Sequence, residues 1–141
     1  TVRCAISVAL VFDASGSMSG PGNAGAKAAG RAFIDEMDGQ IDEAAIIWFT
    51  SVVNISQQMT TLKPMLYTAI DALPASGMTA VWDGCYAGII ELINNGVNQC
   101  RAVVVLTDGR DTSSQRTVSE IVVQNADPVE YGQVLFRIDP A

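Results

Sequence analysis

Asp13, Ser15 and Ser17 place one carboxylate and two hydroxyl groups within five residues of one another. They follow residues 5–12, which are apolar apart from Ser7 and therefore predict a strand buried on both faces. Such a group of oxygen donors suits a small divalent cation, above all Mg²⁺, which prefers oxygen ligands and keeps some of its water. A turn that caps the next helix is the alternative interpretation of the same residues.

Two further oxygen-bearing residues lie at comparable places in the sequence. Asp108 comes soon after residues 101–106, an apolar segment that predicts another strand buried on both faces. Thr79 lies in a loop just before a helix predicted over residues 80–95. In open α/β sheets, ligands bind beyond the carboxyl ends of the strands, so we expect Asp13 and Asp108 to share one site.

The remaining segments alternate between helical and strand patterns. Helices are predicted over 23–37 and 64–73, strands over 44–49 and 52–59, a short helix over 117–124 and a last strand over 134–138. The strands at 44–49 and 52–59 are expected to pair through a tight turn. The alternation predicts an α/β fold with an open, doubly wound and mostly parallel sheet, covered by helices on both faces, in a single domain spanning 1–141.

Composition excludes several classes of function. The formal net charge is −7, which disfavours nucleic-acid phosphate as a partner. The chain has no histidine, so Ser-His-Asp and Cys-His catalysis and histidine-bound zinc are excluded. No apolar run approaches the roughly 20 residues of a membrane-spanning helix, and we expect no membrane insertion by this domain.

The three cysteines do not have the spacing of a metal site. Cys4 and Cys100 each begin an apolar strand, and neighbouring strands lie about 4.8 Å apart, within reach of a disulfide. However, Cys4 lies an odd number of residues before Asp13 and Cys100 an even number before Asp108, which favours opposite faces of the sheet. A disulfide and two free thiols therefore both stay open, whereas Cys85 is predicted to be a buried free thiol.

Three stretches together resemble the von Willebrand factor type A family. They are Asp-Ala-Ser-Gly-Ser-Met at 13–18, Gly-Met-Thr-Ala-Val-Trp-Asp at 77–83 and Leu-Thr-Asp-Gly at 106–109. The resemblance implies a Rossmann-like fold with a metal-ion-dependent adhesion site. In that site Ser15, Ser17 and Thr79 would supply hydroxyl ligands, Thr79 directly or through water, while Asp13 and Asp108 would hold ordered waters, with Asp108 able to bind directly. An acidic side chain of a protein partner would complete the shell around Mg²⁺, or alternatively Ca²⁺ or Mn²⁺.

The resemblance also implies a setting and an extent for the domain. It implies a non-enzymatic, adhesion-type module that is extracellular or at the cell surface, with a cytoplasmic scaffold of an ATPase-associated or metal-insertion complex as the alternative. A disulfide between Cys4 and Cys100 would favour the extracellular setting, because cytosolic thiols stay reduced. The sequence after Leu106 has room for one helix and one strand where the resemblance implies two of each. The last helix and strand are therefore expected to be absent, cut off or supplied by another segment.

Two enzyme-like or cofactor-binding interpretations use some of the same residues. Residues 20–25 match the dinucleotide pattern G-x-G-x-x-G, but the first glycine comes late after the strand. A metal-dependent phosphoester hydrolase would use Asp13 as nucleophile or ligand, with Lys27 or Arg110 binding phosphate. It would also need a further carboxylate or a general base, for which Asp83 and Asp111 are the candidates.

Overall fold

The structure is a computed structural model, and its elements largely follow the predicted alternation. The structure describes residues 3–122, 124, 128, 133–134 and 136–139. The elements are β1 (Ile6–Asp13), the 3₁₀ turn η1 (Gly16–Met18), α1 (Pro21–Glu36), β2 (Glu43–Phe49), β3 (Val53–Thr60), α2 (Lys63–Asp71), α3 (Val81–Asn95), β4 (Cys100–Leu106), β5 (Thr117–Ile121) and β6 (Phe136–Asp139).

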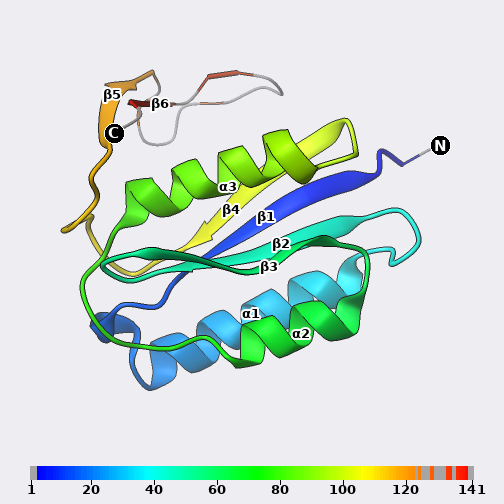
Figure 1. The fold of residues 1–141 in the computed structure, drawn as a ribbon, viewed down its shortest axis with the longest axis horizontal. Helices are drawn as coiled ribbons and strands as arrows, with labels where there is room; N and C mark the ends of the chain where they lie inside the picture. Colours follow the sequence, from blue (N-terminus) through cyan, green and yellow to red (C-terminus); the bar gives the residue numbers. More distant parts are fainter. Residues whose placement is uncertain (1–2, 123, 125–127, 129–132, 135, 140–141) are drawn as a thin grey trace.

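The main sheet has the strand order β3-β2-β1-β4, with β1 at its centre (Figure 1). Strand β1 is parallel to both neighbours, and Phe12 is level with Trp48 of β2 and Leu106 of β4. Strands β2 and β3 form the predicted antiparallel hairpin. The predicted mostly parallel sheet is therefore confirmed, and the carboxyl ends of β1, β2 and β4 meet at one edge.

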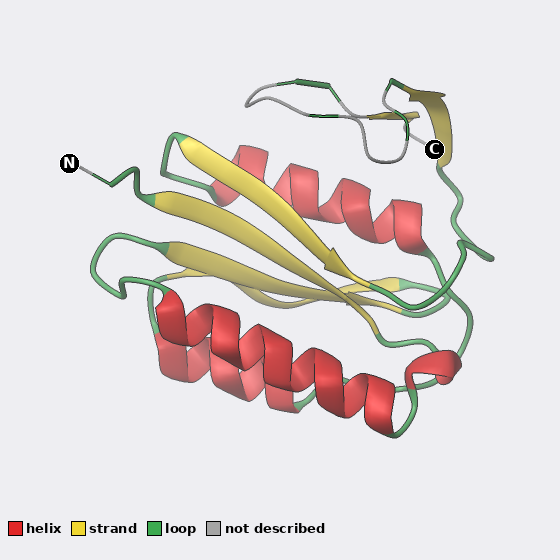
Figure 2. Cartoon of the chain, turned by 180° about the vertical axis from the view of Figure 1, so that it is seen from behind, coloured by secondary structure: helices red, strands yellow, loops and turns green. Residues whose placement is uncertain are grey.

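Helices cover both faces of this sheet, as the sequence predicted. Figure 2 shows α1 and α2 side by side on one face, with α3 on the other. Alternate residues of β1 divide between the two layers because successive side chains of a strand point to opposite faces. Leu10 and Phe12 pack with Ile34 of α1 and Ile70 of α2, whereas Val11 belongs to the cluster around α3.

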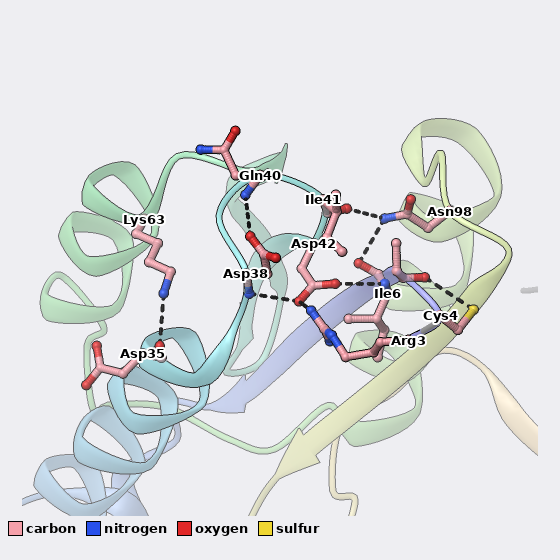
Figure 3. Close-up of polar contacts among 11 residues, drawn as sticks. Arg3, Cys4, Ile6, Asp35, Asp38, Gln40, Ile41, Asp42, Lys63 and Asn98 are labelled. Carbon is pink, nitrogen blue, oxygen red and sulfur yellow. Dashed lines mark hydrogen bonds and ion pairs between the residues drawn. The ribbon is translucent and has the colours of Figure 1, made fainter. Parts of the chain in front are cut away.

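A polar network closes the end of the sheet where β1 begins (Figure 3). The fully buried carboxylate of Asp42 accepts hydrogen bonds from Arg3 Nη2 at 2.5 Å and from the backbone N–H groups of Ile6 and Asp38 at 3.0 and 2.9 Å. Desolvation raises the pKa of Asp42, but these hydrogen bonds outweigh it and hold the pKa below its ordinary value. This end of the sheet is thus fixed by satisfied polar groups.

The structure resolves the alternatives left open for the cysteines. Cys4 and Cys100 form a disulfide, and Cys85 is a buried free thiol whose pKa burial raises to about 11. The expectation that the two cysteines face opposite sides of the sheet was wrong, because Phe12 pairs with Leu106 and Asp13 is therefore not level with Asp108. Cys100 in fact pairs with Ile6, two residues after Cys4, so both cysteines lie on the same face of the sheet.

The segments after β4 depart from the prediction. The short helix predicted over 117–124 is wrong, because Thr117–Ile121 forms strand β5, which pairs antiparallel with β6. The last strand was predicted over 134–138 and is found at Phe136–Asp139, in this separate two-stranded sheet. The predicted absence of a final helix and strand lies beyond what these described residues decide and stays a prediction.

Strand β4 was expected to be buried on both faces, and that expectation was wrong. In the described part of the chain β4 is an edge strand of the main sheet, because β1 is its only strand neighbour. Its residues Ala102 to Leu106 are consequently half-buried rather than buried.

None of the described helices combines the length and the hydropathy that a membrane-spanning helix needs.

Candidate metal centre

Asp13 is the last residue of β1 and is held at the carboxyl edge of the sheet. Its side chain is buried, and the residue is only 1% exposed. Asp13 Oδ1 accepts a hydrogen bond of 2.8 Å from the Ser15 backbone N–H, and Oδ2 accepts one of 2.6 Å from Thr107 Oγ1. These two bonds fix the orientation of the carboxylate, because each engages a different oxygen.

A continuous set of oxygen contacts links the turn after β1 to the loop after β4. The hydroxyl oxygens of Ser15 and Ser17 are 3.0 Å apart, and Ser17 Oγ donates a hydrogen bond of 3.0 Å to Asp108 Oδ1. The short η1 turn places Ser15 and Ser17 close together, with Ser15 buried and Ser17 exposed. The contact to Asp108 joins the turn after the central strand β1 to the loop after its neighbour β4.

The loop that carries Thr79 is fixed by backbone hydrogen bonds to the residues that directly follow β1 and β2. Ser76 N–H donates to Ala14 O at 2.8 Å, and Ala80 N–H donates to Thr50 O at 2.9 Å. Gly77 between them has a φ of 82°, a conformation that side chains disfavour. A Cβ there would also lie 3.4 Å from Thr50 Cβ. Glycine at this position therefore allows the loop to pass over the end of β2 and present Thr79.

Thr79 lies near the Asp13 carboxylate, beneath the loop that follows Asp108. A Cβ at Gly109 would lie 4.0 Å from both Thr79 Oγ1 and Asp13 Oδ2, so these two oxygens border the same small space. Thr79 is buried, with 7% of the residue exposed. The five predicted ligands, Asp13, Ser15, Ser17, Thr79 and Asp108, are thus gathered at one edge of the sheet.

The donor set suits a divalent cation with room for an outside ligand. It consists of hydroxyl and carboxylate oxygens, the ligands that Mg²⁺ accepts. Among the described residues, no cluster of three or more acidic, cysteine or histidine side chains forms a metal cage. Neutral hydroxyl ligands neutralise a cation less than carboxylates do, so they preserve its attraction for a further anion. That these five residues bind a cation stays a prediction.

A second layer of residues, which the sequence analysis did not assign to the site, holds Thr79 in place. Thr79 N–H donates to Thr112 Oγ1 at 3.0 Å, and Thr112 N–H donates to Thr79 O at 2.7 Å. Beside them, Asp83 accepts hydrogen bonds from the backbone N–H groups of Gln115 and Arg116 at 2.9 and 3.0 Å. The only sign in the sequence of the contact between Thr79 and Thr112 is the polar run Asp-Thr-Ser-Ser at 111–114.

The structure gives no support to the competing interpretations of the glycines and of Lys27. Gly22 and Gly25 lie inside α1, which begins at Pro21, so the G-x-G-x-x-G pattern does not form a loop between strand and helix. Lys27 Nζ donates to the backbone oxygen of Asp71 at 2.8 Å, away from Asp13. It is therefore not placed to bind phosphate at the candidate site.

Comparison with known proteins supports the fold. No protein-family model matches this sequence, and no curated protein matches it. Among solved structures, the chain is similar to the vWF domain of the type V pili tip protein Mfa5 from Porphyromonas gingivalis, with a TM-score of 0.74 and 21% identity over 94% of this chain and 46% of that one. It is also similar to the PilB minor pilin from Streptococcus sanguinis, with a TM-score of 0.68 and 22% identity over 77% of this chain and 30% of that one.

A third similar structure carries the name of the family itself. It is the von Willebrand factor type A protein from Catenulispora acidiphila, with a TM-score of 0.53 and 23% identity over 60% of this chain and 22% of that one. This chain spans less than half of the length of each of these three structures. At identities this low the similarity establishes the fold alone, and it agrees with the motifs read from the sequence. The chain therefore has a von Willebrand factor type A-like fold.

Proposed function

We propose that this chain is a protein-binding module that engages its partner through a divalent cation, with Mg²⁺ as the first candidate and Ca²⁺ or Mn²⁺ as alternatives. The observation that carries the proposal is the convergence of oxygens from separate segments on one edge of the sheet. Ser15, Ser17 and Thr79 would hold the cation through hydroxyls, and Asp13 and Asp108 through their carboxylates or through water. The cation would supply a strong electrostatic attraction for an acidic side chain of the partner.

The similar solved structures support a protein-interaction role in general terms. Two of them are a pilus tip protein and a minor pilin. An extracellular or surface location is part of the proposal, and the chain's own disulfide between Cys4 and Cys100 supports it. Disulfides persist in oxidising compartments and are rare in the cytosol, which counts against the cytoplasmic scaffold.

Isothermal titration calorimetry with Mg²⁺ tests the cation site directly. The Asp13→Asn variant keeps the shape of the side chain but removes the charge and exchanges one acceptor oxygen for an amide. We expect it to lose measurable Mg²⁺ binding. Asp71→Asn is the matched control, because it makes the same charge change at an exposed residue of α2 that is paired with Arg31. The control is expected to bind Mg²⁺ like the unmodified protein.

The two variants also define the result that contradicts the proposal. If Asp13→Asn takes up Mg²⁺ and Mn²⁺ with unchanged affinity, the oxygens at the edge of the sheet do not form the site. A circular dichroism spectrum and a melting curve of Asp13→Asn would show that the variant is folded, so that lost binding reflects the site itself.

A further inference from the structure

An apolar pocket of about 350 Å³ opens beside Asp108, between α1 and β4. Helix α1 lines it with Gly22, Gly25 and Ala26, and β4 lines it with Val105 and Leu106. Among the residues that the structure describes, its only charged lining residue is Asp108, at the boundary with the candidate metal centre. The pocket thus joins an apolar wall to the site where an acidic side chain is proposed to bind.

The pocket is open on its α1 side because two of the three lining residues there are glycines, and on its β4 side because β4 is the outer strand of the described main sheet. A Cβ at Gly25 would meet nothing within 4 Å, whereas a Cβ at Gly22 would meet Met18 Sδ at 3.6 Å. Glycine costs helix stability relative to alanine, so two glycines within the first turns of α1 are not explained by helix formation. The Met18 thioether forms a third side of the pocket, and methionine adapts easily to different neighbours.

The pocket and the candidate metal centre are built from the same two segments. Met18 directly follows Ser17, and Leu106 and Thr107 directly precede Asp108. Ser17 Oγ and Asp108 Oδ1, which are 3.0 Å apart, bridge these segments at the pocket's rim. A ligand that places a carboxylate at the metal centre therefore has an apolar surface immediately beside it.

We propose that this pocket, named here the α1–β4 pocket, is a specificity subsite that takes an apolar side chain next to the acidic residue of the protein partner. The inference rests on the proposed function and adds the partner's chemistry, an acidic residue flanked by an aliphatic one. The acidic group binds at the cation, and the aliphatic group moves out of water into the space between Gly25, Leu106 and Met18. Each methylene group buried in this way strengthens binding about fourfold.

Small carboxylates provide a defined probe of both halves of the site. Acetate carries the carboxylate alone, whereas 4-methylpentanoate adds an aliphatic tail of the size of a leucine side chain. In nuclear magnetic resonance titrations of the Mg²⁺-loaded protein, we expect 4-methylpentanoate to bind at least about tenfold more tightly than acetate. The backbone amide signals of Gly25 and Val105 should shift with 4-methylpentanoate and stay in place with acetate.

Filling the pocket from within isolates its contribution. Gly25→Leu introduces a side chain into the open space and favours the helix, so the variant is expected to fold. It should lower the affinity for 4-methylpentanoate to that for acetate and leave the affinities for acetate and Mg²⁺ unchanged. Ala28→Leu is the matched control, since Ala28 is an exposed residue of α1 outside the pocket. Gly25→Ala should show a smaller effect of the same kind if leucine disturbs the helix.

The outcomes separate this inference from the proposed function. Equal affinities for acetate and 4-methylpentanoate, or a tail preference that survives Gly25→Leu, overturn the pocket as a subsite and leave the metal centre standing. If the protein takes up no Mg²⁺, or if neither carboxylate binds the Mg²⁺-loaded protein, the proposed function fails and this inference fails with it.

Discussion

The Ser17 hydroxyl donates a hydrogen bond of 3.0 Å to Asp108 Oδ1, although the two residues lie 91 positions apart in the sequence. The contact follows from topology, because Ser17 follows β1, Asp108 follows β4, and these strands are parallel neighbours. Their carboxyl ends meet at one edge, where the loops of an open α/β sheet gather. The same contact also places the mouth of the α1–β4 pocket beside the candidate cation ligands.

Removing the Ser17 hydroxyl should weaken the stabilisation that Mg²⁺ provides. A ligand present at 100 times its dissociation constant raises the free energy of unfolding by about 2.7 kcal/mol. We expect Ser17→Ala to gain clearly less than the unmodified protein at the same Mg²⁺ concentration. Without Mg²⁺, and after treatment with a chelator, the two should differ by less than about 0.5 kcal/mol, because Ser17 is exposed.

Urea unfolding with and without Mg²⁺ measures this difference. Ser19→Ala is the matched control, since it removes a nearby exposed hydroxyl that is not among the candidate ligands. An equal Mg²⁺-dependent gain in Ser17→Ala, Ser19→Ala and the unmodified protein would show that the Ser17 hydroxyl is no ligand.

Breaking the disulfide between Cys4 and Cys100 should cost a large part of the stability. The bridge joins residues 96 positions apart, and in the chain-entropy treatment a closed loop of about 100 residues is worth about 4.7 kcal/mol. The double variant Cys4→Ser and Cys100→Ser is therefore expected to unfold at a markedly lower urea concentration. Because β4 has β1 as its only strand neighbour in the described main sheet, the loosened strand should also show faster amide exchange.

A reducing agent provides the control for this prediction. It should lower the stability of the unmodified protein to that of the double variant and leave the double variant unchanged. Equal stability of the oxidised protein and the double variant would mean that the hydrogen bonds between β1 and β4 alone hold the edge strand.

The local pattern of apolar residues predicted the elements that are buried in the core, above all the central strand. Residues 5–12 are apolar on both faces apart from Ser7, and the central strand that they form is buried by neighbours on both sides and by helices on both faces. The position of Asp13 at the end of that strand follows directly. The candidate site was predictable to the same extent, because its residues come directly after strands or directly before a helix.

Contacts between distant segments decided the parts that the sequence did not reveal. Thr117 to Glu120 fits a helix cap, and only the pairing with β6, where Val118 is level with Ile138, makes it a strand. The support of Thr79 by Thr112 joins residues 33 positions apart, so no local pattern announces it. The half-buried state of β4 likewise depends on which strands lie beside it.

Asp42 should make the stability depend on pH in the acid range. Its folded-state pKa is lowered because the hydrogen bonds from Arg3, Ile6 and Asp38 outweigh desolvation. A carboxyl group with a lowered folded-state pKa contributes stability above its unfolded pKa of about 3.9, and the contribution is lost as the pH falls through the folded-state value. We expect Asp42→Asn to be less stable by about 2 kcal/mol at pH 7.

The difference between the two proteins should shrink as the pH falls below about 4. Thermal unfolding from pH 7 to pH 2 measures it, with Asp38→Asn as a control that changes a neighbouring exposed carboxyl group. A difference that stays constant across this range would mean that the charge of Asp42 does not contribute and that only its shape matters.

A methyl group at Gly84 should destabilise the packing of α3 on the sheet. A Cβ there would lie 2.5 Å from Phe49 Cδ1 and 3.1 Å from Val11 Cγ1, both in the buried layer beneath α3. We expect Gly84→Ala to lower the free energy of unfolding by about 1–3 kcal/mol, even though alanine favours a helix by about 1 kcal/mol over glycine. Gly25→Ala is the matched control, because a Cβ there meets nothing within 4 Å and should raise the stability by about 0.5–1 kcal/mol. Urea unfolding of the two variants compares them directly, and a gain in stability for both would show that α3 can move away from Phe49 without cost.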